Sequence, residues 1–260
     1  MQAASFDNYA QQYDAHFTFS PVGLLQRQSV YKQLLPLLSR DTSVLEINCG
    51  TGYDAIEIAK YVKNIFATDA SAIMIEQCMA RKAETKNVVF KVDPIQDLQD
   101  EIKNANFIFS NFGGLNCLSP KDLKEFSKKC NTLLNKDADL FFVIMGRKCI
   151  WERLYFMIKG DQEKATRRKS VAGINTIING SEFNTWYYSP KEIQLFFSEG
   201  FKTQHMSSVG FFVPPSYLNP FFLKKKLLLK LFSALDKVFC NFKWTTNYAD
   251  HYIIHLKKIS

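Results

Sequence analysis

The chain has 260 residues, of which 47% are hydrophobic and 22% are charged. This is the composition of a globular protein, and it excludes a disordered or fibrous one. The net charge of +8 is uneven, because residues 201–260 hold nine Lys and two Asp and so carry +7. A basic segment of this kind predicts a local acidic partner or surface, and it disfavours a protein that coats nucleic acid.

Cysteine spacing and the first residues indicate the cellular compartment. The six cysteines lie far apart, without the C-x-x-C spacing of a zinc ribbon or a redox pair. The opening residues, MQAASFDNYAQQYD, lack the basic region and apolar stretch of a secretory signal. No apolar run approaches the roughly 18 residues of a membrane span. We therefore expect reduced, mostly buried thiols, no metal site and a cytoplasmic protein.

Helix and strand patterns alternate along the first part of the chain. Apolar runs that predict strands lie at 43–49, 64–67, 88–92, 106–112 and 139–145. Segments that predict helices lie at 22–38, 53–61, the stretch after Ser71, and 121–134. Strands that are apolar throughout and alternate with helices predict an α/β fold with a parallel sheet buried on both faces.

The pattern changes after residue 145. Residues 147–169 have helical spacing, and 171–188 predict two strands around Asn179-Gly180, a pair typical of a hairpin turn. Residues 189–200 predict a helix with a capping Ser and a final Gly, and 201–213 and 250–257 predict the last strands. Ligands bind at the carboxyl ends of strands in an open α/β sheet, so insertions there would form a lid.

The most informative stretch is VLEINCGTGYDA, which leads a strand through a glycine turn into a helix. Gly50 and Gly52 let the backbone approach a ligand closely, although a Gly-x-Gly-x-x-Ala pattern also fits dinucleotides. Glu46, near the end of this strand, would repel a pyrophosphate and attract an ammonium or sulfonium group. Asp69, at the end of the second strand, can accept both hydroxyls of a ribose. A ribose with a cationic tail favours S-adenosylmethionine over a nicotinamide dinucleotide.

Four segments resemble the motifs of class I S-adenosylmethionine-dependent methyltransferases. They are LEINCGTG (45–52), ATDASAIMI (67–75), VDPIQDL (92–98) and FIFSNFGGLNCL (107–118), and both ends of the chain are similar to small-molecule members. Asn48 stands where many members have Gly, and Asn tolerates a positive φ better than most residues.

The resemblance implies one Rossmann-like domain with helices on both faces of a mostly parallel seven-stranded sheet whose last strand is antiparallel. The expected core comprises about 41–146, 190–213 and 248–260, and the expected cap comprises about 1–40, 147–189 and 214–247.

The resemblance also implies the cofactor contacts. Glu46 would bind the methionine ammonium of S-adenosylmethionine. The backbone at Asn48, Gly50 and Gly52 would hold the methionine end of the cofactor, and Asp69 would bind its ribose. The other expected contacts are Ala70, Met74, Pro94 and Ile95 beside the adenine, Asp93 on its amino group, Ser110 and Asn111 near the methyl, Tyr13 over the cofactor and Arg27 on its carboxylate. No catalytic residue is assigned beyond His16, a candidate base because the N-terminal segment often covers the active site in this family.

The acceptor is expected to be a small, apolar or aromatic molecule, free or bound to a carrier protein. No Asp-Pro-Pro-Tyr type of sequence follows the fourth strand, which disfavours amino-group methylation of DNA bases or glutamine. The rings that could line an acceptor pocket are Trp151, Tyr155, Trp186, Tyr187 and Tyr188, and packing in the core or lid explains them equally well.

Residues 221–239 predict an amphipathic helix, with Lys226, Lys230, Ser233 and Lys237 on one face and leucines on the other. It is either a lid helix with a solvated lysine face or a helix that docks on an anionic membrane or an acidic carrier protein. Two other functions stay open: a non-catalytic docking protein that keeps the cofactor fold, and an NAD(P)-dependent oxidoreductase. Nucleic acid is disfavoured because the basic cluster is local and rich in Leu and Phe.

Overall fold

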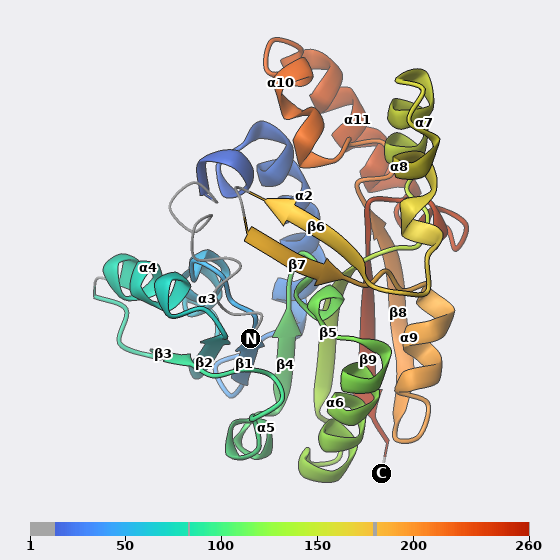
Figure 1. Ribbon diagram of the computed structural model, residues 1–260. Helices are drawn as coiled ribbons and strands as arrows, with labels where there is room; N and C mark the ends of the chain where they lie inside the picture. Colours follow the sequence, from blue (N-terminus) through green and yellow to red (C-terminus); the bar gives the residue numbers. More distant parts are fainter. Residues whose placement is uncertain (1–13, 83, 179–180, 260) are drawn as a thin grey trace.

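The computed structural model describes residues 14–82, 84–178 and 181–259. A seven-stranded sheet in the order β3-β2-β1-β4-β5-β9-β8 forms its centre (Figure 1). The strands are β1 (Ser43–Ile47), β2 (Asn64–Asp69), β3 (Val88–Val92), β4 (Phe107–Ser110), β5 (Asp139–Met145), β8 (Phe201–Val209) and β9 (His251–Lys258). The strands from β3 to β5 in this order pair in parallel, and β9 is antiparallel to both β5 and β8. The predicted sheet and its antiparallel last strand are therefore confirmed.

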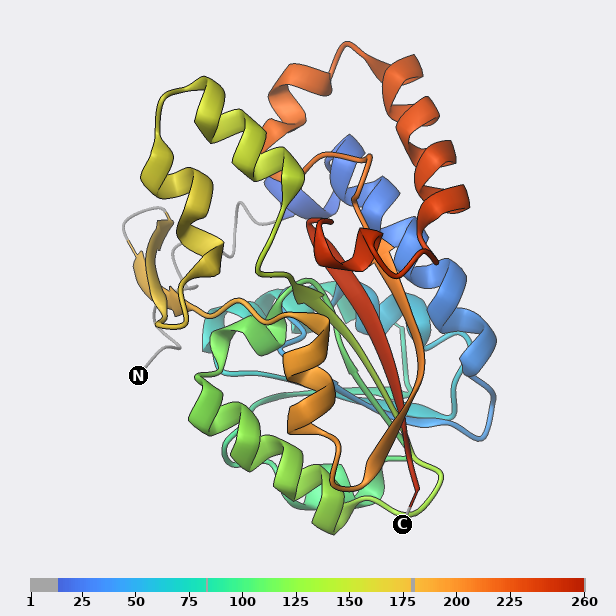
Figure 2. The same ribbon diagram turned by 90° about the vertical axis from the view of Figure 1, so that its right-hand side faces the viewer.

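Both faces of this sheet are covered by helices (Figure 2). One face packs against α5 (Asp100–Asn104), α6 (Pro120–Leu133) and α9 (Pro190–Phe196), and the other against α2 (Pro21–Leu34), α3 (Tyr53–Ile58) and α4 (Ala72–Lys82). Alternate residues of one strand enter the two layers: Leu140 and Phe142 face the first group of helices, and Phe141 faces the second. Burial on both sides explains why these strands are apolar at successive positions.

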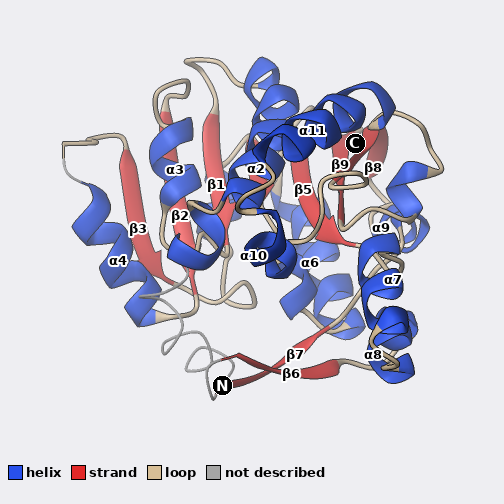
Figure 3. Cartoon of the chain, turned by 90° about the horizontal axis from the view of Figure 1, so that it is seen from above, coloured by secondary structure: helices blue, strands red, loops and turns tan. Residues whose placement is uncertain are grey.

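A third apolar cluster lies above the carboxyl ends of the strands. It joins α7 (Ile150–Ile158), α10 (Asn219–Phe222) and α11 (Lys226–Phe239) through buried side chains such as Phe222 and Leu229. The short α8 (Gln162–Thr166) follows α7, and β6 (Ile174–Ile178) pairs with β7 (Ser181–Thr185) as a separate ribbon beside the sheet (Figure 3). The register Ile178↔Ser181 agrees with the predicted hairpin, although Asn179-Gly180 themselves lie outside the described residues.

Two helix predictions need correction. The single helix expected over 147–169 is divided into α7 and α8, because Gly160 adopts a left-handed φ of 72° and the Asp161 side chain accepts a hydrogen bond from the Lys164 amide at 2.9 Å. Gly tolerates that conformation and Asp is a favoured helix cap, so the two residues end one helix and begin the next. The helix expected over 22–38 ends earlier, at Leu34, and continues only as a 3₁₀ turn that contains Pro36.

One buried carboxylate ties α11 to the loop after β8. Asp236 accepts hydrogen bonds from the amides of Phe212 and Val213 at 2.8 and 2.9 Å. Burial raises the pKa of this carboxyl from 3.8 to about 6, although the amide bonds act in the opposite direction. The raised pKa means that folding favours the protonated form, so the associated stability is present at low pH and is lost as the pH rises through about 6.

We therefore expect the free energy of unfolding to vary with pH differently in the wild type and in Asp236→Asn. The wild-type value minus the variant value should fall by about 2 kcal/mol between pH 4 and pH 7, because most of the effect of raising the pKa from 3.8 to about 6 lies in this interval. Urea unfolding across this range measures the effect, with the exposed Asp41→Asn as control. Parallel pH profiles for the wild type and Asp236→Asn would contradict this origin.

Candidate cofactor site

Three left-handed residues build the turn after β1. Asn48, Gly50 and Gly52 have φ values of 55°, 55° and 71°. The expectation that Asn48 can hold this conformation is confirmed, and its side-chain amide also donates to the Gly114 carbonyl at 2.5 Å, which ties the turn to the loop after β4. A Cβ at Gly52 would lie 2.8 Å from the Cys78 sulfur, whereas a Cβ at Gly50 would meet nothing within 4 Å. The Gly50 side of the turn thus leaves room for a ligand.

Glu46 presents a buried carboxylate beside this turn. It is 2% exposed, and no described residue donates a hydrogen bond to its Oε2 atom. Burial, followed by the charge of nearby Asp54, raises the pKa of Glu46 well above its usual range. A buried carboxylate without a donor is costly, so a cationic ligand group that reached Glu46 would be strongly favoured.

Asp69 joins the ends of β1 and β2. Its two carboxylate oxygens accept hydrogen bonds from the amides of Gly50 and Ser71, each at 2.9 Å. The Ser71 hydroxyl accepts from the amide of Met74 at 3.2 Å, so it caps α4. These contacts hold the Asp69 carboxylate at the glycine turn, where the sequence predicts the ribose.

The expected adenine contacts gather at the neighbouring strand ends. Met74 and Ile95 are buried, and Ala70 and Pro94 are half-buried. Asp93 donates its amide to the Asp69 carbonyl at 2.9 Å, and its carboxylate pairs with the ammonium of Lys91 at 2.7 Å. The backbone bond places Asp93 next to Asp69, and its contact with the adenine stays a prediction.

Asp54 organises the other side of the turn. The Arg27 guanidinium bonds it through Nε and Nη2 at 2.8 and 3.3 Å, the Tyr31 hydroxyl donates to it at 2.5 Å, and the Asn111 amide donates to it at 3.0 Å. Burial raises the pKa of Tyr31, and its bond to the Asp54 carboxylate raises it further. One carboxylate thereby connects α2, α3 and the residue that follows β4. The sequence pattern does not predict this role of Asp54.

Comparisons with known proteins identify the domain that contains this turn. A family model described as a methyltransferase domain matches residues 44–137, the segment that holds β1 to β4 and the glycine turn. Residues 44–137 are thus a methyltransferase domain, and the chain has the Rossmann-like fold of class I S-adenosylmethionine-dependent methyltransferases. No curated protein matches the sequence.

Solved structures are similar to this methyltransferase over most of its length. A putative S-adenosylmethionine-dependent methyltransferase from Listeria monocytogenes is 16% identical with a TM-score of 0.62, and the match covers 91% of this chain and 99% of that one. Phosphoethanolamine N-methyltransferase 1 from Haemonchus contortus is 17% identical with a TM-score of 0.62, over 99% of this chain and 49% of that one. A putative methyltransferase of Haloferax volcanii, solved with the Trm112 activator, is 12% identical with a TM-score of 0.61. This match covers 100% of this chain and 98% of that one. At these identities the likeness shows the shared fold.

Of the remaining predicted site residues, the structure describes the side chains of some and not of others. Ser110 is buried at the end of β4, and no described residue bonds its hydroxyl oxygen. The Arg27 guanidinium lies within 6 Å of the centres of three rings (Phe17 at 5.6, Tyr53 at 4.8 and Phe112 at 5.1 Å). Its contact with the cofactor carboxylate stays a prediction. Tyr13 and the side chain of His16 lie outside the described residues.

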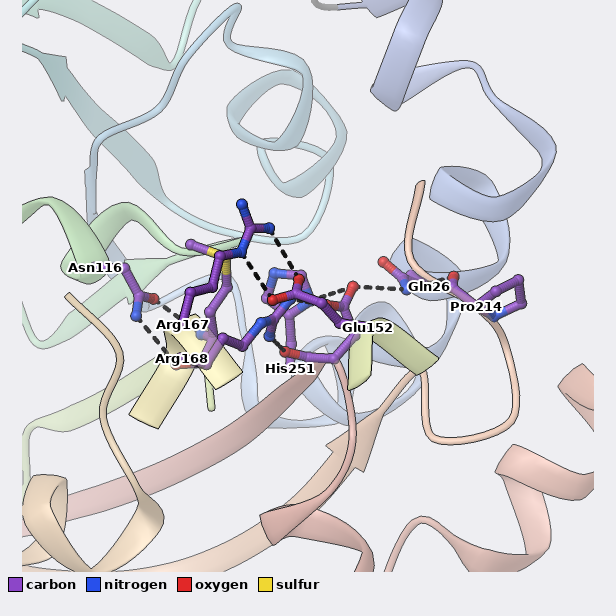
Figure 4. Close-up of polar contacts among 9 residues, drawn as sticks. Gln26, Asn116, Glu152, Arg167, Arg168, Pro214 and His251 are labelled. Atoms are coloured by element: carbon purple, nitrogen blue, oxygen red, sulfur yellow. Dashed lines mark hydrogen bonds and ion pairs between the residues drawn. The ribbon is translucent and has the colours of Figure 1, made fainter. Parts of the chain in front are cut away.

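A buried charged network connects α7, α2 and the residue before β9 (Figure 4). The Arg168 guanidinium bonds Glu152 at 3.0 Å and Asp250 at 2.8 Å, and Gln26 of α2 donates to Asp250 at 3.3 Å. Burial alone would raise the pKa of Asp250, but the neighbouring His251 and Arg168 hold it below its usual range. The network fixes α7 and the start of β9 to α2.

His251 connects this network to the loop after β4. Its Nδ1 lies 3.3 Å from the Asp250 carboxylate, and its ring meets Phe112 edge-on with the ring centroids 5.5 Å apart. Phe112 itself has a positive φ of 42°, an unusual conformation for a bulky residue. The sequence predicts no role for His251, because only the pairing of β5 with β9 brings it to this loop. The other C-terminal histidines bond elsewhere, His205 to Gln33 and His255 to Asp139.

Proposed function

We propose that this methyltransferase moves the methyl group of S-adenosylmethionine to a small, apolar or aromatic acceptor, free or carried by a protein. The observation that carries the cofactor part is the buried Glu46 oxygen without a donor, next to the open side of Gly50. A pyrophosphate would add negative charge beside Glu46, Asp54 and Asp69, which lie close to one another, and this disfavours the dinucleotide oxidoreductase. The acceptor part rests on the ring-rich segments outside the sheet, in which Trp151 contacts Phe222 and Tyr155 contacts Tyr217.

The chain's own residues would hold and align the reactants. Glu46 would bind the methionine ammonium, the turn from Asn48 to Gly52 would hold the methionine end, and Asp69 would bind the ribose. The bound cofactor supplies a methyl group that is already activated on a positively charged sulfur. The protein therefore contributes mainly alignment and exclusion of water, and a proton acceptor is needed only if the acceptor keeps a proton at neutral pH.

Calorimetric titration with S-adenosylhomocysteine, with NADH as parallel ligand, tests the cofactor assignment. We expect micromolar binding of the first and none of the second. Binding of NADH alone would overturn the proposal. Binding of S-adenosylhomocysteine without methyl transfer to any member of a panel of phenols, catechols and carrier-bound acyl groups would favour the non-catalytic docking protein instead.

Replacing Asp69 by alanine should weaken S-adenosylhomocysteine binding by about 10- to 100-fold. The loss of one charge-assisted bond to a ribose hydroxyl has that magnitude, at about 1.5–3 kcal/mol. Asp69→Asn is the matched variant, because it keeps one oxygen for the Gly50 amide and removes the charge. Affinities of Asp69→Ala within twofold of the wild type would show that Asp69 does not contact the cofactor.

A further inference from the structure

Two helices at one end of the molecule expose aligned apolar side chains. In α11, Leu227, Leu231 and Val238 are 83%, 55% and 66% exposed, and at 100° per residue they fall within about 40° of one another. In α7, exposed Ile150, Leu154 and Ile158 recur every four residues, and Ile158 is 86% exposed. Apolar residues aligned in this way mark an interaction site, unlike single exposed ones.

The two helices belong to one surface. The Trp151 ring of α7 contacts Phe222 of α10 and Phe232 of α11, with centroids 6.0 and 5.8 Å apart, and its indole nitrogen donates to the carbonyls of Phe211 and Phe212. Both helices stand at the top in two perpendicular views (Figures 1 and 2). We call this the cap surface; its exposed apolar residues are Ile150, Leu154, Met157, Ile158, Phe221, Leu223, Leu227, Leu231, Val238, Phe242 and Trp244.

The charges of the cap surface have one sign. Six exposed lysines lie between Phe221 and Trp244, namely Lys224, Lys225, Lys226, Lys230, Lys237 and Lys243. The one acid of this segment, Asp236, is buried against the loop after β8. In α7 the acid Glu152 is likewise buried, on Arg167 and Arg168, whereas Arg153 is exposed. The cap surface is therefore cationic and apolar at once.

We infer that the cap surface docks on an anionic lipid bilayer. Helices that lie in a membrane interface combine lysines with exposed Leu, Phe and Trp, and Trp is enriched at the depth of the headgroups. A second copy of this chain is disfavoured because it would bring two cationic faces together. No helix in the described part of the chain is long and apolar enough to cross a bilayer, so the contact is with one leaflet.

Docking would also orient the edge of the sheet that holds the candidate cofactor site. The cap leaves the sheet at the carboxyl ends of β5 and β8, the same edge at which Glu46 and Asp69 lie. A bilayer on the cap surface would therefore lie near the entrance of the cofactor site. The docking inference itself depends only on the cap surface and holds whatever the acceptor is.

Flotation of the full chain with vesicles tests the inference. We compare vesicles of phosphatidylcholine alone with vesicles of phosphatidylcholine that contain about 30% phosphatidylglycerol. The second kind has the anionic surface that attracts basic segments. We expect binding to the anionic vesicles to exceed binding to the neutral ones by at least about tenfold, and to weaken with salt. A triple variant, Lys226→Gln, Lys230→Gln and Lys237→Gln, should lose most of it, since each lysine near the surface contributes about fivefold.

A second variant separates docking from charge attraction alone. Ile158→Ser, Leu227→Ser and Leu231→Ser together should also reduce anionic-vesicle binding by about tenfold, because exposed leucines would enter the interface. Leu195→Ser, an equally exposed residue of α9 outside the cap surface, is the matched control and should bind as the wild type.

Three results would overturn the inference: no binding of the wild type to anionic vesicles, binding that the serine variant does not alter, or self-association that the same substitutions abolish. S-adenosylhomocysteine titration of each variant keeps this outcome separate from the proposed catalytic function.

Discussion

Asp54→Asn should lower the free energy of unfolding by about 3–5 kcal/mol. The side chains of Arg27 and Asp54 are 5% and 8% exposed, and the replacement leaves the guanidinium buried without its counter-charge. It also weakens the bonds from Tyr31 and Asn111, which converge on the same carboxylate. Urea denaturation at pH 7 measures the change.

A control on the same helix isolates the effect of burial. Glu57 of α3 pairs with Lys60 at 2.8 Å, but these side chains are 38% and 58% exposed. Glu57→Gln should therefore cost about 0.5 kcal/mol or less. If Asp54→Asn cost no more than this control, Asp54 would not be the centre of the network. Partial recovery in Arg27→Met/Asp54→Asn would show that the unpaired guanidinium carries the penalty.

Glu46→Gln should reduce affinity for S-adenosylhomocysteine by about 10- to 100-fold, the range expected for a charged hydrogen bond worth 1.5–3 kcal/mol. The raised pKa of Glu46 adds a proton linkage to this prediction. The ligand's ammonium lowers that pKa, so binding releases a proton from Glu46. Wild-type affinity should rise with pH up to the pKa of the free protein and be flat above it.

Calorimetry in buffers of different ionisation enthalpy detects the released proton. Glu46→Gln should abolish that release, and Glu57→Gln should retain it. A wild-type affinity that is independent of pH, with no proton exchanged, would show that the ammonium binds elsewhere.

The part of the site that is local in sequence could be predicted from the residues alone. Glu46, the turn through Gly52, and Asp69 follow directly from strand ends and glycine spacing, and Asn48 adopts the positive φ that its amide side chain tolerates. The sheet followed from the alternation of apolar runs with helical segments, because each strand is buried on both faces.

The contacts across the fold could not be predicted in this way. An acid in the first turn of a helix has an ordinary explanation in the helix dipole, so Asp54 gave no signal. Its partners Arg27 and Asn111 lie 27 residues before it and 57 residues after it. The same holds for Arg168 and Asp250, which are separated by 82 residues and meet only in the folded chain.

The basic helix α11 shows a second limit of prediction from the sequence. Its periodicity predicts an amphipathic helix, and the structure has one at Lys226–Phe239. Leu229 packs inward as a lid helix requires, but Leu227 and Leu231 remain exposed. A sequence gives the angular positions of the side chains, whereas the neighbouring elements decide which angle is covered.

The position of β9 constrains the order of assembly. This strand follows β8 in the chain but lies between β5 and β8 in the sheet, and its pairs with β5 join residues more than a hundred positions apart. Because β8 pairs only with β9, it can join the sheet only after β9 has paired with β5. Pairing over such separations is slow because loop-closure entropy is lost before contacts form. During synthesis, β5 therefore remains an open edge of the sheet until β9 is translated.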